Sequence, residues 1–182
     1  MNQINQINKN TKIVTAVIIV LTLTAAIFAI FNQDYIAGKK AMQDSGTFII
    51  TAIDGSRYIV ATDDILSLDP QAINANYKPS RNNVPTQKQF TGVSLKSVFD
   101  HFGVDYSIAK SVGFTAADGY ASALPIADAL DEENCFIVFE EEGEPLGTKE
   151  NGGNGPFMMI LANDQFSQRW CKFLLEIELK GG

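Results

Sequence analysis

The sequence predicts an α+β domain, dominated by β-strands, behind one N-terminal transmembrane helix. Three observations lead to this prediction. An uncharged apolar run occupies residues 13–31, many short segments after residue 46 alternate apolar and polar side chains, and only two or three short segments show helical spacing. A chain of 182 residues with 46% hydrophobic content can bury one sizeable core, so we expect a single globular domain after the helix.

The run "IVTAVIIVLTLTAAIFAIF" (13–31) has the length of a membrane span. As a helix it would extend about 28 Å, close to the thickness of a bilayer's hydrocarbon core. A cleavable signal peptide is the alternative, but such a peptide has a shorter apolar core and ends in a small-x-small site. The sequence offers only a weak match to that site, around Ala37. We therefore predict an uncleaved, single-pass anchor in the cell membrane.

Two lysines precede the anchor and two follow it, so the positive-inside count is nearly balanced. Because a short N-terminal segment usually stays inside, we expect the globular domain outside the cytoplasm, with a cytoplasmic domain as the alternative. The expected parts are a cytoplasmic segment (1–12), the anchor (13–31), a linker (32–45) and the globular domain (46–180).

The charge of the chain argues against nucleic acid as a partner. The formal net charge is −7 and the isoelectric point is near 4.6. Binding to a phosphate backbone needs clustered basic side chains that displace counterions. Nucleic acid is therefore not an expected partner, whereas the apolar run makes the membrane one.

The first elements of the domain are predicted from local patterns. Apolar residues alternate on both sides of Asp54-Gly55-Ser56, which indicates a β-hairpin. Thr62 is expected to cap a short helix, because its hydroxyl can accept a hydrogen bond from a free helix N–H group. The segment "NANYKPSRNNVPTQKQ" (74–89) is rich in asparagine and proline and is expected to form an exposed, irregular excursion.

The next segment, "SLKSVFDHFG" (94–103), predicts an amphipathic helix with Ser94 as its N-cap and Gly103 as its C-terminal stop. His101 lies off the apolar stripe and is expected to face solvent. Further strands are expected at "SVGFTAA", "YASAL", "CFIVFEE", "PFMMILA" and "FLLEIEL".

The two cysteines, Cys135 and Cys171, lie far apart and have no metal-ligand spacing. Outside the cytoplasm they could form a disulfide. Both have strongly apolar neighbours, so two buried core thiols are an equally good interpretation.

Two further segments have a ligand-binding interpretation and a simpler one. The acidic stretches 131–134 and 140–144 could provide carboxylates for calcium, but they lack the spacing of a binding loop and are better interpreted as solvated turns. The glycine-rich "KENGGNGP" (149–156) could surround a phosphate with its N–H groups. No helix pattern follows it, so a hairpin loop is favoured.

Taken in order, four blocks resemble the molybdopterin-binding domain of the sulfite oxidase family. The blocks are "FTGVSLKSVFDHFGV" (90–104), "VGFTAADGYASALPIADAL" (112–130), "EEGEPLGTKENGGNGPFMMIL" (141–161) and "QRWCKFLLEIEL" (168–179). The resemblance covers about half of the chain in collinear order. It implies a β-rich, sulfite-oxidase-like fold that binds molybdopterin or another pterin.

The resemblance also implies roles for three residues. Tyr120, five residues before Pro125, matches a family tyrosine next to the substrate oxyanion, where a phenol can donate a hydrogen bond. Arg169 and Lys172 match basic residues that hold the phosphate of the pterin. The alternatives are a tyrosine that seals a turn over the core and two surface charges that flank Trp170.

The sequence also departs from the family. Catalytic members bind molybdenum through a cysteine that corresponds to the region 72–85 here, and "AINANYKPSRNNVP" contains none. One of the residues 74–77 stands near that position, and none of them supplies a soft anionic sulfur. The arginine that commonly follows the "GP" of the family is also absent. Molybdenum bound in the usual way is therefore not expected, and Cys135 and Cys171 belong to structural blocks.

Three functions fit these observations. The first is a membrane-anchored domain that binds a pterin or another anionic cofactor without the usual molybdenum catalysis. The second is a non-enzymatic docking subunit of a membrane redox or transport complex, since tethering raises the effective concentration near membrane partners. The third is an active molybdopterin-dependent oxidoreductase with solvent or another residue on the metal.

Overall fold

The structure, a computed structural model, describes residues 2–78 and 84–182, with side chains from residue 11 except at positions 30, 32, 34 and 35. The chain divides into two units, Met1–Lys39 and Lys40–Gly182. The elements are α1 (Asn2–Asp44), β1 (Thr47–Thr51), β2 (Arg57–Ala61), α2 (Thr62–Leu66), β3 (Gln71–Tyr77), β4 (Thr86–Ser94), α3 (Leu95–Phe102), β5 (Ser111–Ala116), β6 (Ala121–Pro125), α4 (Ile126–Ala129), β7 (Cys135–Glu141), β8 (Glu144–Pro145), the 3₁₀ turn η1 (Lys149–Asn151), β9 (Met158–Leu161), the 3₁₀ turn η2 (Ser167–Arg169) and β10 (Leu174–Lys180).

Helix α1 contains the predicted apolar run. Its stretch Thr11–Ala29 is long and apolar enough to cross a membrane, and none of it is buried. The hydroxyls of Thr15, Thr22 and Thr24 each donate to the carbonyl four residues earlier, at 2.8–2.9 Å. Their polar groups are therefore satisfied within the helix, as a hydrocarbon environment requires. Most of the segment expected as a linker (32–45) is helical, because α1 continues to Asp44.

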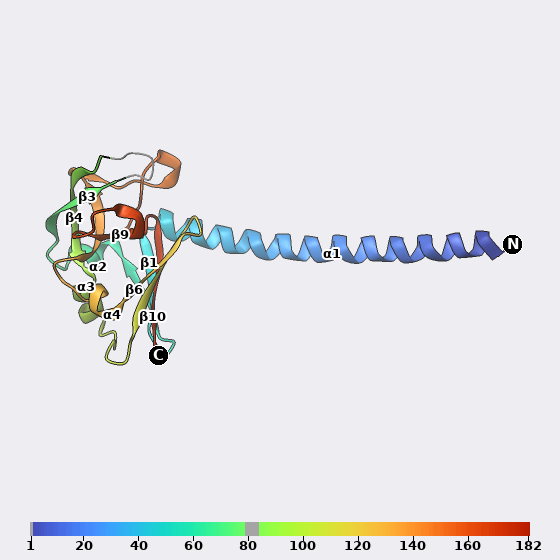
Figure 1. The fold of residues 1–182 in the computed structure, drawn as a ribbon, viewed down its shortest axis with the longest axis horizontal. Helices are drawn as coiled ribbons and strands as arrows, with labels where there is room; N and C mark the ends of the chain where they lie inside the picture. The colour runs from blue at the N-terminus through green and yellow to red at the C-terminus, as the bar shows by residue number, and fades with distance from the viewer. Residues whose placement is uncertain (1, 79–83) are drawn as a thin grey trace. The chain divides into compact units, whose positions relative to one another are not determined.

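The second unit contains two five-stranded sheets (Figure 1). The first has the order β2-β1-β10-β5-β6, in which β1 and β10 are parallel and the other pairs are antiparallel. The second has the order β3-β4-β7-β8, in which β8 pairs with the last two residues of β7. Strand β9 pairs with the first part of β7, from Cys135 to Val138. One continuous cluster of buried side chains is contributed by both sheets, so they share a single core. The largest fully buried side chains include Phe48, Phe90, Phe99, Phe114 and Phe157.

The hairpin, the amphipathic helix and the five later strands are confirmed. Ser94 Oγ accepts a hydrogen bond from the Ser97 N–H group at 3.1 Å and so caps α3. Gly103 ends the helix with a φ of 63°, a left-handed conformation that glycine adopts without strain. His101 is exposed, as expected.

The interpretation of residues 74–89 as irregular was wrong at both ends. Residues 71–77 and 86–94 form β3 and β4, which pair in antiparallel register from Gln71↔Gly92 to Tyr77↔Thr86. Ile73 and Ala75 are buried, while Asn74 between them and Ala72 and Asn76 on either side are exposed. Small alanines carry this alternation, so the pattern is weak in the sequence. Residues 79–83 lie outside the described residues.

Thr62 does not cap α2. The helix begins at Thr62 directly after β2, so the cap position falls on Ala61. Asp64 supplies the capping contact instead, because its carboxylate accepts from the Ala61 N–H group at 2.8 Å. The Thr62 hydroxyl donates to the Gly46 carbonyl at 3.2 Å and ties the helix to the residue that precedes β1.

Candidate functional site

The segment 164–172, between β9 and β10, is held by two segments that are distant from it in the sequence. On one side, Ser167 Oγ accepts from the Lys78 N–H group at 3.2 Å and donates to the Lys78 carbonyl at 3.0 Å. On the other, the Tyr120 hydroxyl donates to the Gln168 carbonyl at 2.7 Å. The segment that carries two of the predicted site residues is thus fixed against the third.

Tyr120 follows the tight turn that the sequence indicates. The Asp118 carboxylate accepts from the Tyr120 N–H group at 3.0 Å, and Gly119 has a φ of 90°. The phenol is 39% exposed. Burial of its inner part, and to a lesser degree the nearby Cys171 thiol, raises the pKa of Tyr120, so its proton stays in place at neutral pH. In the structure that proton is used to hold Gln168.

Ser122 was not predicted and lies in β6, two residues after Tyr120. Its Oγ is buried and has no hydrogen-bond partner among the described residues. Ser122 acts to lower the pKa of Tyr120, so the two hydroxyls are neighbours although no hydrogen bond joins them. Buried hydroxyls without a partner are uncommon, and a ligand oxygen or a water molecule would satisfy this one. The period of two from Tyr120 is the signal that could have identified it.

Arg169 lies in η2 and is paired with carboxylates. Its Nε and Nη2 donate to the two oxygens of Asp164 at 2.9 and 2.5 Å, and its Nη1 lies 3.9 Å from Asp128. The hydrogen bond with Asp164 raises the pKa of Arg169. The Arg169 side chain is 47% exposed, but that of Asp164 is only 18% exposed and the pair is bidentate, so a phosphate would have to displace a well-placed carboxylate from the guanidinium.

Lys172 lies against Tyr77, the last residue of β3. Its Nζ donates to the Tyr77 hydroxyl at 3.1 Å and lies 5.0 Å from the centre of the ring. Within the described residues, no carboxylate forms an ion pair with Lys172. Lys88 also lies over the Tyr77 ring, at 4.6 Å, but it is paired with Glu141. Lys172 is therefore the better placed of the two ammonium groups for an anionic ligand.

Tyr77 stands in the region where the resemblance places the cysteine of catalytic members. Its ring packs 6.0 Å from that of Trp170, which connects β3 to the segment with Lys172. A phenol that accepts a hydrogen bond from an ammonium group keeps its own proton for another acceptor. Tyr77 can therefore donate to a ligand oxygen, but it supplies no sulfur.

Cys135 and Cys171 are free thiols and both are fully buried, so the disulfide alternative was wrong. Cys135 lies in β7, and Cys171 forms an isolated bridge with Met159 of β9. Burial raises the pKa of Cys171 from 9.0 to about 12 and raises that of Cys135 still further. Neither residue offers an accessible thiolate at neutral pH.

We expect both thiols to resist iodoacetamide at pH 8 in the folded protein and to react fully in urea. Their raised pKa values also make stability depend on alkaline pH. Between about pH 9 and 12 the unfolded chain releases thiol protons that folded Cys171 retains, so its contribution to stability is complete below pH 9 and declines above it. Mass spectrometry of alkylated peptides checks the first point and urea titrations across this range check the second. Rapid stoichiometric alkylation of either cysteine in the folded protein would contradict the assignment.

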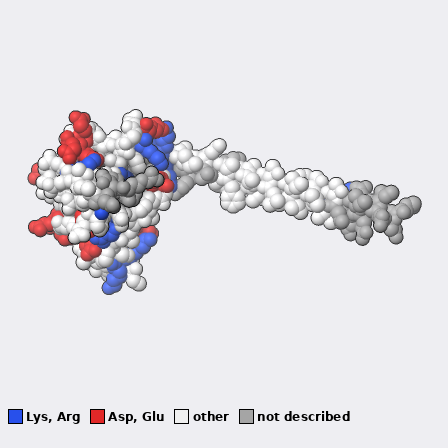
Figure 2. All heavy atoms as spheres, turned by 45° about the horizontal axis from the view of Figure 1, so that its top comes forward, with Lys and Arg blue, Asp and Glu red and all other residues white. Residues whose placement is uncertain are grey.

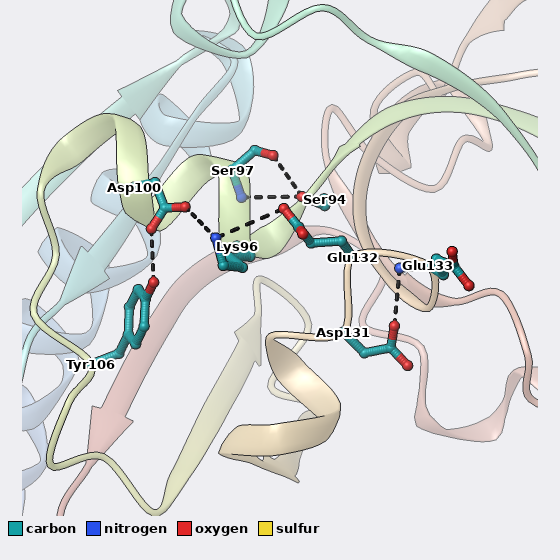
Figure 3. A network of polar contacts seen from close by, with 8 residues as sticks. All are labelled: Ser94, Lys96, Ser97, Asp100, Tyr106, Asp131, Glu132 and Glu133. Atoms are coloured by element: carbon teal, nitrogen blue, oxygen red, sulfur yellow. Dashed lines mark hydrogen bonds and ion pairs between the residues drawn. The ribbon is translucent and has the colours of Figure 1, made fainter.

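The acidic stretch 131–134 belongs to a surface network (Figure 3). Lys96 on α3 forms ion pairs with Asp100 at 2.6 Å and Glu132 at 3.8 Å, and the Tyr106 hydroxyl donates to Asp100 at 2.9 Å. Asp131 accepts from a backbone N–H group within its own turn. Among the described residues, no group of three potential metal ligands comes together. The geometry is that of a solvated turn joined to a helix.

Backbone N–H groups of the glycine-rich segment 149–156 form hydrogen bonds with the residues just before the segment. The N–H groups of Gly153, Asn154 and Gly155 donate to the carbonyls of Thr148, Leu146 and Gly147 at 2.9–3.0 Å. They are therefore not available to a phosphate. The segment is a loop but not the expected hairpin loop, because β8 and β9 on either side of it both pair with β7 and not with each other. The surface visible in Figure 2 mixes acidic and basic side chains over the β-rich unit and shows no continuous basic track.

Among the grooves formed by the described residues, two do not include Tyr120 or Lys172. One, of about 410 Å³, lies beside α2 and the turn between β7 and β8; the other, of about 330 Å³, is lined by Ile53, Tyr58 and Ile108 among others. Neither groove includes a predicted site residue.

Comparison with known proteins identifies the class of protein that this fold represents. Residues 71–181 match the model of the oxidoreductase molybdopterin-binding domain, and the chain belongs to this family. No curated protein matches the sequence. The crystal structure of the sulfane dehydrogenase SoxCD from Paracoccus pantotrophus has a similar fold, with a TM-score of 0.62 and 15% sequence identity. The match covers 75% of this chain and 38% of that one. The β-rich unit is thus a molybdopterin-binding, oxidoreductase-like domain with a sulfite-oxidase-like fold.

The family implies a pterin-type cofactor, and the residues of this site fit its polar groups. Lys172 provides an ammonium group without a carboxylate partner among the described residues, and Ser122 provides an unpartnered buried hydroxyl. The residues do not fit molybdenum held by a protein thiolate. Both cysteines are buried in the core, and the region 72–85 has none. No chemical step is therefore assigned to molybdenum.

Proposed function

We propose that the chain is a membrane-anchored, extracytoplasmic domain that binds a molybdopterin or related pterin without holding molybdenum through a cysteine. Lys172 binds the phosphate of the cofactor, and Arg169 joins it when the phosphate replaces Asp164. Helix α1 provides the single-pass anchor. The observation that carries the proposal is the position of Lys172, a half-buried cation that donates to Tyr77 at the end of β3 and forms no ion pair with a carboxylate among the described residues.

The protein's own residues supply binding and orientation. An ammonium group beside a guanidinium can donate several charge-assisted hydrogen bonds to one phosphate. The hydroxyls of Ser122 and Tyr77 can contact polar atoms of the rest of the ligand. Tyr120 holds Gln168 and thereby keeps η2, which carries Arg169, in place. A polar ligand would enter a site whose backbone is already ordered, which reduces the entropy lost on binding.

The test is the cofactor content of the full chain, purified from its native host in mild detergent. Charge-assisted bonds to a phosphate contribute about 1.5–3 kcal/mol each. The double variant Arg169→Ala/Lys172→Ala should therefore bind the cofactor roughly 100- to 10,000-fold more weakly while remaining folded. Mass spectrometry of the released small molecule and elemental analysis for molybdenum give the readout.

A matched control separates the site from general effects. The variant Lys96→Ala/Lys180→Ala removes the same number of positive charges from ion pairs elsewhere and should keep the cofactor. Tyr120→Phe removes the hydroxyl that holds Gln168, so it should weaken cofactor binding by about ten-fold at most, the usual contribution of one hydrogen bond. A wild-type protein that carries no phosphorylated ligand would reject the proposal in favour of a docking subunit, and stoichiometric molybdenum would favour an active oxidoreductase.

A further inference from the structure

The groove of about 410 Å³ has the size of a ligand site and is mainly apolar. Its lining includes none of the predicted site residues Tyr120, Arg169 and Lys172. Its apolar walls come from three parts of the second unit and consist of Leu66, Phe139, Pro145, Leu146, Pro156 and Phe157. Leu66 is 50% exposed, so an apolar side chain of the groove is accessible to a ligand.

The glycine-rich segment gives this groove a rigid wall. A Cβ atom on Gly153 would lie 2.1 Å from the Leu146 carbonyl oxygen, and one on Gly155 would lie 2.7 Å from Leu146 Cβ. Only glycine permits this close packing. Two hydrogen bonds, from Asn154 to Leu146 and from Gly155 to Gly147, fix the same wall. The "GGNG" motif, which serves no phosphate, therefore shapes the groove in advance.

The charges that line the groove select against an anion. Asp44 and Glu140 are its charged lining residues, both acidic, and no basic residue belongs to the described lining. A phosphate headgroup beside these two carboxylates would be repelled. Polar contacts for a neutral group remain, since Thr62 and Thr148 also line the groove. The occupant that fits is apolar and uncharged.

Chain connectivity indicates where such a molecule comes from. Residues 32–42 separate the apolar run from Gln43, the first residue that lines the groove. Even a fully extended segment of this length reaches at most about 40 Å, so the anchor keeps the groove near the bilayer whatever the arrangement of the two units. Uncharged lipids are concentrated there. This step rests on the membrane anchor of the proposed function.

We propose that this groove binds the apolar chain of an uncharged membrane lipid. The test uses the full chain in phosphatidylcholine nanodiscs that contain a trace of diacylglycerol with a diazirine in one acyl chain. Irradiation should label peptides from 62–66 or 139–148. The same diazirine carried by phosphatidylglycerol should label them at least ten-fold less, because its headgroup is anionic.

Two matched variants make the result specific. Leu66→Asp places a charge in the groove and should reduce labelling at least ten-fold, whereas Ile59→Asp, at a 69% exposed position outside the groove, should leave it unchanged. Equal labelling by both lipids, no label in the two segments, or a Leu66→Asp variant labelled like wild type would each overturn the inference. A chain that fails to enter nanodiscs overturns the anchor as well. Cofactor content, measured on the same samples, reports on the pterin proposal separately.

Discussion

Replacing Trp170 with alanine is expected to destabilise the β-rich unit by about 3–5 kcal/mol. The indole is only 3% exposed, and its ring meets Phe90 edge-on at 5.5 Å. Its Nε1–H group donates to the Leu161 carbonyl at 3.2 Å. The substitution therefore creates a cavity and also removes the shorter of the two hydrogen bonds to the Leu161 carbonyl, which then keeps only the Asp164 N–H group at 3.4 Å. Because Trp170 is the single tryptophan, unfolding should be followed by circular dichroism in urea.

The variant Trp170→Phe is the matched control. Phenylalanine fills most of the volume and loses only the N–H group, so we expect a cost of about 1 kcal/mol, the usual contribution of one hydrogen bond. The alanine variant should also lose cofactor, because Trp170 packs against Tyr77 and precedes Lys172 by two residues. An alanine variant within 1 kcal/mol of wild type would show that the indole does not support this part of the core.

Local patterns in the sequence predicted the elements that depend on neighbouring residues. The hairpin around Asp54-Gly55-Ser56 and the helix between Ser94 and Gly103 are fixed by turn and cap chemistry, which the sequence displays directly. The pairing of β1 with β10 joins residues more than a hundred positions apart, and no local pattern encodes it. Strand β3 was not predicted because alanine suits either an exposed or a buried position. With Ala72 exposed and Ala75 buried, the alternation of polar and apolar residues in this strand is weak.

The candidate site was predictable as a set of residue types and not as a set of contacts. Tyr120, Arg169 and Lys172 could be selected from the resemblance, and their roles stay predictions. The contacts that these side chains make in the structure join residues that are distant in the sequence. Arg169 pairs with Asp164 and Asp128, and Lys172 reaches Tyr77 on β3. Ser122 was not predicted, because whether a hydroxyl lacks a hydrogen-bond partner depends on the folded environment and cannot be deduced from the residue type.

Gly92, in the "FTG" block of the family resemblance, should be the least replaceable residue of β4. Its Cα approaches β7 so closely that a Cβ atom would lie 2.3 Å from the Ile137 carbonyl oxygen and 2.7 Å from Val138 Cα. Both contacts are backbone atoms of a strand that is also paired with β9, so β7 cannot move aside. The register of β4 and β7 shifts between Thr91 and Gly92, which places the glycine at this bulge.

We therefore expect Gly92→Ala to destabilise the unit by roughly 3 kcal/mol or more, at the upper end of the cost of overpacking. Gly113→Ala is the matched control, because Gly113 also lies in a strand and its Cβ would meet the movable end of Lys180 at 3.4 Å and the Glu178 carbonyl oxygen at an ordinary contact distance of 3.8 Å. That control should stay within about 0.5 kcal/mol of wild type, as surface substitutions usually do. Urea titrations of both variants compare them directly. Equal stabilities would mean that β4 can separate from β7 at this point, and the glycine would then serve another purpose than close strand packing.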